Sequence, residues 1–271
     1  MDKTMQEKLS LILPWLPSAG RPEIVDVGTG TGNLAGAVAK MYPHAQVIGI
    51  DLSPEMIEIA KTQNNFQNLT FRLVAAHTPF SKESSAAIYS SILHEIYSYS
   101  GDSLEAVRSA LSVANQSLMK GGRIIIRDFI QPSNGDKVVI LVHNKSDMVP
   151  ENTFQNFAQN FGRKVPFKVI AETADSISYE TNLASAYEYI FRKDYHANWD
   201  VELNEKYGFW TREEALSLLQ GSGFRILKYE ELDNAWILAN RIEGKVKIID
   251  PATKEDIPIP KYQTIIAAEK K

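Results

Sequence analysis

The stretch that decides the fold is "IVDVGTGTGNLAGAVAKMYPHAQVIGIDLSP", residues 24–54. It opens with a short β-branched run, residues 24–27, which is typical of a buried parallel strand. The chain then turns through a glycine-rich segment, residues 28–32, and residues 33–41 carry apolar side chains at a helical spacing. A second buried strand is predicted over residues 47–50. This order of strand, glycine loop, helix and strand predicts a right-handed βαβ unit.

The glycine loop has the features of a cofactor site. Gly28, Gly30 and Gly32 permit a tight turn and let the backbone approach a ligand closely. Asp51 follows the second strand, about 20 residues beyond the loop, where an acid can accept hydrogen bonds from ribose hydroxyls. A nucleoside-containing cofactor is therefore predicted. This spacing alone leaves its identity open, because NAD-binding folds share it.

Two details of the loop favour S-adenosylmethionine over a dinucleotide. The glycines follow the pattern G-x-G-x-G rather than G-x-G-x-x-G, and Asp26 stands two residues before the first of them. A carboxylate is unfavourable where a pyrophosphate must lie against backbone amides and a helix N-terminus. The ammonium and sulfonium groups of S-adenosylmethionine are instead stabilised by a nearby acid. We therefore predict S-adenosylmethionine as the cofactor and S-adenosylhomocysteine as its product.

With these residues, "VDVGTGTGNLA" followed by "VIGIDLSPEMIEIAK" resembles the class I S-adenosylmethionine-dependent methyltransferases. The resemblance covers residues 20–130 and the C-terminal strands. It implies an α/β, Rossmann-like, doubly wound and mostly parallel seven-stranded sheet with an antiparallel C-terminal strand. The strand-like segments "FRILKYEEL" and "YQTIIAAEK" fit that plan, whereas an NAD-binding sheet would continue in parallel.

The resemblance also implies which residues hold the cofactor. The loop supports the methionine part, Asp51 holds the ribose, and Leu52 and Met56 lie beside the adenine. Many members carry an acid after the third strand, where this chain has Ala76 and His77. The full set of expected cofactor residues is Asp26, Gly28, Gly30, Gly32, Asp51, Leu52, Met56, Ala76, His77 and Ser91.

A candidate base follows the fourth predicted strand. His94 lies at the carboxyl edge, where open α/β sheets bind ligands, and an unperturbed imidazole titrates near working pH. We expect His94 to be the catalytic base, with Glu95 as its partner, if the acceptor must lose a proton. The alternative is a structural histidine that fixes the strand-to-helix turn. No spacing resembles a zinc site, so no catalytic metal is predicted.

Between the fifth strand and the helix "TREEALSLLQ" lies an insertion of roughly eighty residues, which is long for a structureless loop. Two stretches in it, residues 151–162 and 182–210, are consistent with helices, and aromatic side chains are frequent. We predict a helical lid over the carboxyl edge that forms the acceptor pocket. The alternative is that the aromatic residues only pack the lid onto the sheet. The candidate substrate residues are Tyr195, Trp199, Trp210 and Asp128.

The predicted organisation has four parts. An N-terminal helix occupies residues 1–19, the S-adenosylmethionine-binding core residues 20–130, and the helical lid residues 131–210. Residues 211–271 form a C-terminal helix and a β-hairpin that complete the core sheet. The long excursion at residues 233–260 is predicted to be an arm over the sheet rather than a dimer contact, so a monomer or a homodimer is expected.

Composition narrows the function classes. The absence of cysteine excludes a disulfide framework and a cysteine nucleophile, and no apolar run is long enough to cross a bilayer. A net charge of −4 gives no overall attraction to nucleic acid. We therefore predict a cytoplasmic enzyme that methylates an oxygen or nitrogen of a small molecule.

Three other functions stay open at this point. The first is methylation of RNA or protein, for which a basic rim is available. The second is an NAD-dependent oxidoreductase built on the same βαβ unit, and the third is a non-catalytic cofactor-binding protein. The residues of the possible basic rim are Lys137, Lys145, Arg163, Lys164 and Lys168.

Overall fold

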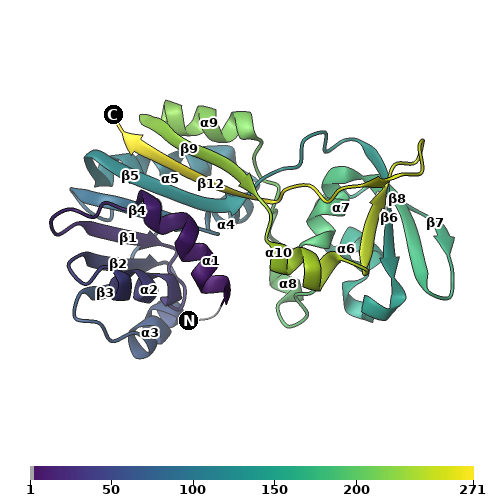
Figure 1. Cartoon of the computed structure of the whole chain (residues 1–271), viewed down its shortest axis with the longest axis horizontal. Helices are drawn as coiled ribbons and strands as arrows, with labels where there is room; N and C mark the ends of the chain where they lie inside the picture. The colour runs from purple at the N-terminus through teal and green to yellow at the C-terminus, as the bar shows by residue number, and fades with distance from the viewer. Residues whose placement is uncertain (1–2) are drawn as a thin grey trace. The chain divides into compact units, whose positions relative to one another are not determined.

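A computed structural model describes residues 3–271, which fold into two compact units (Figure 1). The first unit comprises the chain up to Asp128 together with residues 213–230 and 264–271. The second unit comprises residues 129–212 and 231–263. The expected N-terminal helix is α1, Lys3–Ile12, and the first two residues of that prediction lie outside the described residues.

The first unit contains the predicted seven-stranded sheet, in the order β3-β2-β1-β4-β5-β12-β9. Strands β1 to β5 pair in parallel. β12 runs antiparallel to β5, because Thr264 near its start bonds to the carbonyl of Asp128 and Lys270 at its end bonds to that of Leu118. The predicted fold class is thereby confirmed for the core. The strands are β1 Glu23–Val27, β2 Gln46–Asp51, β3 Leu69–Leu73, β4 Ser84–Ser90, β5 Leu118–Phe129, β9 Phe224–Leu232 and β12 Gln263–Lys270.

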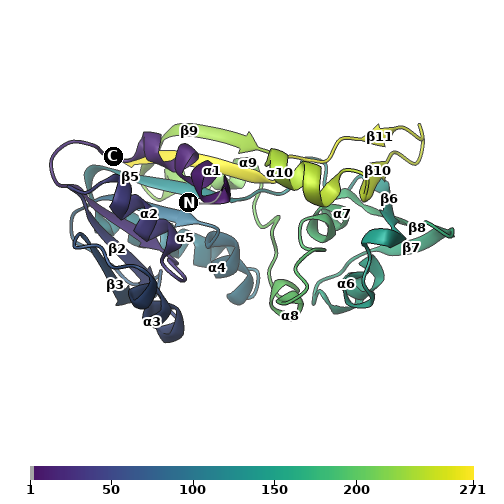
Figure 2. The same ribbon diagram turned by 60° about the horizontal axis from the view of Figure 1, so that its bottom comes forward.

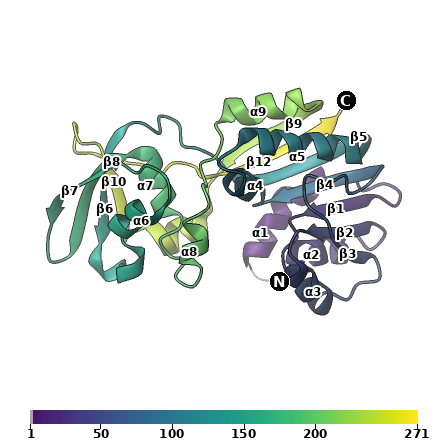
Figure 3. The same cartoon turned by 180° about the vertical axis from the view of Figure 1, so that it is seen from behind.

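Helices cover both faces of this sheet. Figure 3 shows α4 and α5 on one face, and Figure 1 shows α1 on the other. Local capping explains where helices begin: Ser53 caps α3 by accepting from the Met56 amide, and Pro54 occupies the first helical position. The helices are α1, η1 Leu13–Trp15, α2 Asn33–Met41, α3 Pro54–Gln63, α4 Leu93–Tyr99, α5 Leu104–Ser117 and α9 Arg212–Gly221.

The second unit corrects the prediction of a helical lid. Its centre is a five-stranded antiparallel sheet in the order β11-β10-β6-β8-β7. Residues 233–260, predicted to be an arm over the core sheet, instead supply two strands of this second sheet. The strands are β6 Val138–Asn144, β7 Phe167–Glu172, β8 Ser176–Asn182, β10 Val246–Ile249 and β11 Asp256–Ile257.

Short helices accompany the second sheet. In the view of Figure 2, α6 lies below strands β7 and β8. The two stretches expected to be helical contain α6, α7 and α8, and the strands between them were not anticipated. The helices are η2 Lys145–Asp147, η3 Pro150–Asn152, α6 Phe154–Asn160, α7 Leu183–Ile190, α8 Trp199–Glu202, α10 Ala235–Ile237 and the π-helix η4 Leu238–Ile242.

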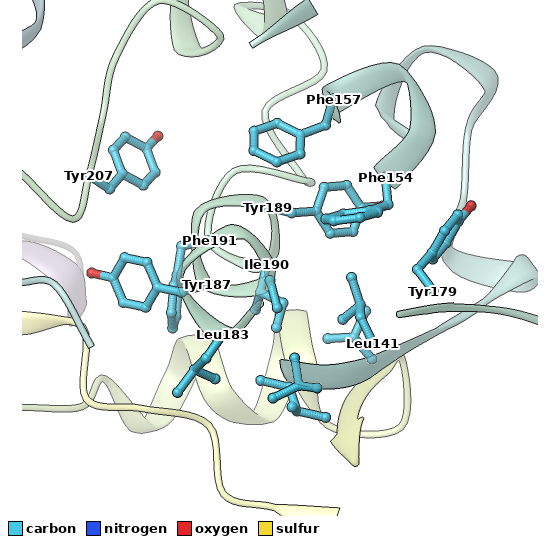
Figure 4. Packing of buried hydrophobic residues seen from close by; sticks show 14 of the residues in the cluster. Leu141, Phe154, Phe157, Tyr179, Leu183, Tyr187, Tyr189, Ile190, Phe191 and Tyr207 are labelled. Atoms are coloured by element: carbon cyan, nitrogen blue, oxygen red, sulfur yellow. The ribbon is translucent and has the colours of Figure 1, made fainter. Parts of the chain in front are cut away.

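The insertion's aromatic side chains form the core of the second unit (Figure 4). The ring of Phe154 on α6 lies 5.0 Å from that of Tyr179 on β8 and 5.1 Å from that of Tyr189 on α7, measured between centroids. Edge-to-face and tilted pairs at these distances add to the free energy gained by burying the rings. Most of the aromatic content of the insertion is thus used to join its own helices to its own sheet.

A buried ion pair fixes the loop after α8. Arg192 is wholly buried and pairs with Glu188. Glu188 also accepts hydrogen bonds from the amides of Tyr207 (3.1 Å) and Gly208 (2.7 Å). A buried charge pair of this kind is stable only when its remaining polar atoms are satisfied, as they are here.

None of the helices within residues 3–271 combines the length and the apolar character needed to cross a membrane.

Candidate active site

The glycine turn after β1 adopts left-handed backbone angles at each of its three glycines. The φ angles of Gly28, Gly30 and Gly32 are 70°, 52° and 77°. The amides of Gly28 and Thr29 both donate to the carbonyl of Ile50, at 2.9 Å. The turn is therefore fixed to the end of β2, at the carboxyl edge of the sheet.

A cavity of about 340 Å³ opens at this turn. A side chain built at Gly30 would meet no atom within 4 Å, so Gly30 borders open space. By contrast, a Cβ at Gly32 would lie 2.6 Å from the ring of Phe71, so the absence of a side chain at Gly32 permits close packing on that ring, and its contact with the cofactor stays a prediction. The cavity is lined by Met5, Lys8, Asp26, Gly28, Thr29, Gly30, Thr31, Asn33, Leu34 and Ser90.

Asp26 places a buried carboxyl group in the cavity. It is 2% exposed and accepts a hydrogen bond of 2.7 Å from the Thr29 hydroxyl. Burial raises its pKa from 3.8 to about 6, although the Thr29 bond and the nearby Lys8 charge lower it. A bound ammonium or sulfonium would stabilise the ionised form. The open space at Gly30 and this carboxyl group together fit S-adenosylmethionine.

Asp51 is half-buried at the end of β2 and shapes the turn from the other side. Its Oδ2 accepts from the amide of Gly30 at 2.8 Å, and its Oδ1 accepts from the amide of Ser53 at 2.9 Å. A carboxylate has lone pairs for further donors, so this one can still bind ribose hydroxyls. Leu52, 71% exposed, and the half-buried Met56 lie next along the chain, and their contact with adenine stays a prediction.

The remaining predicted cofactor residues have different surroundings. Ala76 and the exposed His77 belong to a turn after β3, so their role beside the adenine stays a prediction. Ser91 has a left-handed φ of 57°, and its Oγ accepts from Arg127 at 3.2 Å. The preceding residue, Ser90, is the one that lines the cavity.

His94 is held by Asp128. The Nδ1 atom of His94 lies 2.7 Å from Oδ1 of Asp128, and both side chains are buried. Since a carboxylate only accepts hydrogen bonds, Nδ1 carries the proton and Nε2 of the neutral ring carries the lone pair. With this tautomer, Nε2 is the ring atom that can take a proton from the group that is to be methylated.

Asp128 also organises the helix that carries His94. Its Oδ2 accepts from the amides of Ile92 (3.1 Å), Leu93 (2.8 Å) and His94 (3.4 Å), because amides at the start of a helix have no carbonyl one turn earlier to bond to. Asp128 thus positions both the imidazole and the helix that carries it. The predicted contact of Asp128 with substrate stays a prediction, and so does the predicted partnership of Glu95, which has a carboxylate oxygen within 4.8 Å of a ring nitrogen of His94.

The predicted substrate aromatics all lie in the second unit. Trp210 is wholly buried and its Nε1 donates to the carbonyl of Phe129 at 3.0 Å, so it packs this unit and has no exposed surface for a substrate to contact. Trp199 is 7% exposed and borders a polar cavity of about 430 Å³. Tyr195 is half-buried and its ring faces the guanidinium of Arg241 at 5.3 Å. The latter two stay candidates for substrate contact.

Sequence reasoning missed several cavity residues. Thr29, Thr31 and Asn33 stand within the quoted motif, and their position in the turn was a usable signal. Met5 and Lys8 come from α1, about 20 residues earlier, and nothing in the sequence shows which face of that helix meets the turn.

The contact between the glycine turn and α4 predicts a stability effect. A Cβ at Gly28 would lie 2.5 Å from Cγ1 of Ile92, the residue before α4. We expect Gly28→Ala to lower the free energy of unfolding by about 1–3 kcal/mol more than Gly101→Ala does. The two glycines have similar φ angles, 70° and 74°, but a Cβ at Gly101 would meet nothing within 4 Å. Chemical denaturation of both variants checks this, and equal losses would show that the turn does not pack tightly on Ile92.

The comparison with family models decides the family. A model described as "Methyltransferase domain" matches residues 21–191, which span the glycine turn, Asp51, His94 and Asp128. The chain belongs to this methyltransferase family. The predicted resemblance to S-adenosylmethionine-dependent methyltransferases is confirmed, and S-adenosylmethionine is the cofactor.

Individual relatives of this methyltransferase differ in what they methylate. This chain is 31% identical over 122 residues to a ubiquinone/menaquinone biosynthesis C-methyltransferase, UbiE, of Syntrophotalea carbinolica. The match covers 44% of this chain and 48% of that protein. The chain is 28% identical over 145 residues to a release factor glutamine methyltransferase of Deinococcus radiodurans, with 46% and 51% covered. The chain thus matches about half the length of each of these relatives.

A solved structure matches the methyltransferase along almost its whole length. This is an S-adenosylmethionine-dependent methyltransferase from Mesorhizobium loti, with a TM-score of 0.55, 18% identity, and 97% of each chain covered. At that identity, the similarity concerns the fold alone.

Proposed function

We propose that this protein transfers the methyl group of S-adenosylmethionine to an oxygen or nitrogen of a small-molecule acceptor, with His94 as the base. The observation that carries the proposal is the His94–Asp128 pair, 2.7 Å apart at the end of β4, next to the glycine turn. A base is needed when the acceptor atom bears a proton that must leave. A cytoplasmic location and a monomeric or homodimeric state belong to the same proposal.

Each group in the first unit has a distinct task in this proposal. Bound S-adenosylmethionine supplies an electrophilic methyl group on a sulfonium centre. Asp26 and the glycine turn orient the cofactor, and Asp51 binds its ribose hydroxyls. Nε2 of His94 takes the proton from the group that receives the methyl, and Asp128 stabilises the imidazolium that results. Orientation of the reacting groups can supply roughly 7–11 kcal/mol of the barrier, so positioning is the main contribution of the protein.

A small acceptor is favoured over a nucleic acid by the ion pairs of the second unit. Of the basic rim considered for RNA, Lys137 pairs with Asp250 at 2.8 Å and Lys145 with Glu172 at 2.7 Å. Arg163 donates to the carbonyl of Asn204 at 3.0 Å. Basic side chains that already have partners neutralise fewer phosphates, so fewer counterions leave the RNA and the electrostatic contribution to RNA binding is weaker.

A second candidate is methylation at carbon of a small aromatic ring. The relative from Syntrophotalea carbinolica carries "C-methyltransferase" in its name, which favours this acceptor class. The same base would serve, because removing a ring hydroxyl proton makes the neighbouring carbon nucleophilic. The two candidates therefore share His94 and differ in the atom that receives the methyl group.

Labelled-methyl transfer tests both candidates. The protein is incubated with S-adenosylmethionine carrying a ¹³C-methyl group and with separate panels of phenols, carboxylic acids, amines and quinols, plus tRNA and whole protein. We expect label in a small molecule only. The ¹³C chemical shift then tells an O- or N-methyl group from a C-methyl group. Label in tRNA or in protein, with none in any small molecule, would overturn the proposal.

A further inference from the structure

The cofactor cavity carries charges of both signs from different parts of the chain. Asp26 comes from β1, in the core of the sheet, and Lys8 comes from α1. Lys8 is half-buried, and it is close enough to Asp26 to favour the ionised carboxylate. A ligand in this cavity therefore meets a buried carboxylate and an ammonium group at the same time.

Such a pair of charges complements a zwitterion. The methionine part of S-adenosylmethionine ends in an α-ammonium and an α-carboxylate, and no other part of that molecule carries a negative charge. The ammonium complements Asp26, which leaves the carboxylate to be neutralised. Lys8 is the lysine that lines the cavity, and a lysine ammonium can place a proton donor on one carboxylate oxygen.

We propose that Lys8 binds the α-carboxylate of the cofactor's methionine part, so that helix α1 is a component of the cofactor site. This inference rests on S-adenosylmethionine as the ligand of the glycine turn. Met5, one turn earlier on α1, borders the same cavity and presents an apolar surface beside the charged group. The N-terminal helix thus recognises the amino-acid end of the cofactor, whereas the strand ends recognise its nucleoside end.

The consequence for affinity depends on which ligand group is present. A hydrogen bond between charged partners contributes enough to change a dissociation constant by roughly 10- to 100-fold. This contribution disappears if either the Lys8 ammonium or the ligand's carboxylate is removed. Once one of the two is gone, removing the other weakens binding little further, which is the signature of a direct contact.

Calorimetric titration of four combinations tests the contact. Wild type and Lys8→Met are each titrated with S-adenosylmethionine and with decarboxylated S-adenosylmethionine, which keeps the ammonium and lacks only the carboxylate. We expect wild type to prefer the carboxylated ligand by roughly 10- to 100-fold, and Lys8→Met to bind the two within about threefold. Methionine preserves the aliphatic length of the side chain, and Lys8→Arg should restore most of the preference.

Lys40→Met is the matched control, because Lys40 is exposed in the last turn of α2 and outside the cavity lining. It should retain the wild-type preference. A Lys8→Met variant that keeps the full preference for the carboxylated ligand would overturn the inference and leave the proposed function intact. Failure of wild type to bind either ligand would overturn both.

Discussion

Replacing His94 with alanine is expected to lower kcat by about 10²- to 10⁴-fold while the dissociation constant for S-adenosylmethionine changes by less than about threefold. The reason is that Nε2 of His94 acts on the acceptor proton, whereas the cofactor is held by the glycine turn and Asp51. Turnover with an identified acceptor and calorimetry with the cofactor measure the two quantities separately.

Asp128→Asn tests whether His94 acts through its pair with the carboxylate. Asparagine can still accept one amide bond at the start of α4, but it supports the wrong imidazole tautomer when its amide group faces Nδ1. We expect a loss of at least about 10²-fold in kcat, and a double variant with His94→Ala no slower than the alanine variant alone. His44→Gln, at an exposed turn, is the control. Wild-type turnover in both His94→Ala and His94→Gln would remove His94 as the base.

Asp26→Asn is expected to stabilise the free protein at pH 7 by up to about 3 kcal/mol, since each unit of pKa displacement corresponds to about 1.4 kcal/mol. Burial raises the pKa of Asp26 from 3.8 to about 6, so the folded state binds a proton more tightly than the unfolded state does. That stabilisation is complete below pH 3.8 and is lost as the pH rises through 6. Asparagine is neutral at every pH and avoids the loss.

The free energy of unfolding, measured between pH 3.5 and 8, should therefore fall for wild type relative to Asp26→Asn as the pH rises from about 4 to about 7. The same substitution should weaken S-adenosylmethionine binding by roughly 10- to 100-fold, because the ligand loses its charged partner. Wild-type affinity should in turn decline below pH 6, where protonation of Asp26 competes with the cation. A variant that is no more stable and binds the cofactor normally would contradict this role for Asp26.

The core of the fold could be read from local patterns. The run from β1 to α3 contains short β-branched strands, a glycine turn and a Ser-Pro helix start, each of which has one favourable local structure. The position of β12 followed from the strand-like C-terminal segments together with the family resemblance. These elements are encoded within windows of about ten residues, and the right-handed βαβ rule then restricts how the parallel strands can be arranged in the sheet.

The second unit was harder to predict, because its sheet joins distant segments. β6 pairs with β10, about 100 residues later in the chain, and the alternating pattern of β6 alone does not identify its partner. The aromatic residues of α7 and α8 suggested a substrate lid, but burial in a core is their commoner use. Trp210 shows this most clearly, since none of its surface is exposed.

The site shows the same limit on a smaller scale. Glu95 adjoins His94 in sequence, and one of its carboxylate oxygens lies within 4.8 Å of a ring nitrogen of the imidazole. Asp128, which pairs with Nδ1 of His94, lies on a neighbouring strand and is 34 residues away, so no local pattern indicated it. Lys8 was equally hidden, because its relation to the glycine turn depends on how α1 packs.

The central claim is that the glycine turn binds S-adenosylmethionine, and titration calorimetry tests it most directly. Wild type and Asp51→Asn are titrated with S-adenosylmethionine, S-adenosylhomocysteine and NAD. The account predicts that wild type binds the first two and not NAD, and that Asp51→Asn binds both at least about tenfold more weakly, because it loses charged acceptors for the ribose hydroxyls. Binding of NAD with no binding of S-adenosylmethionine would contradict the account.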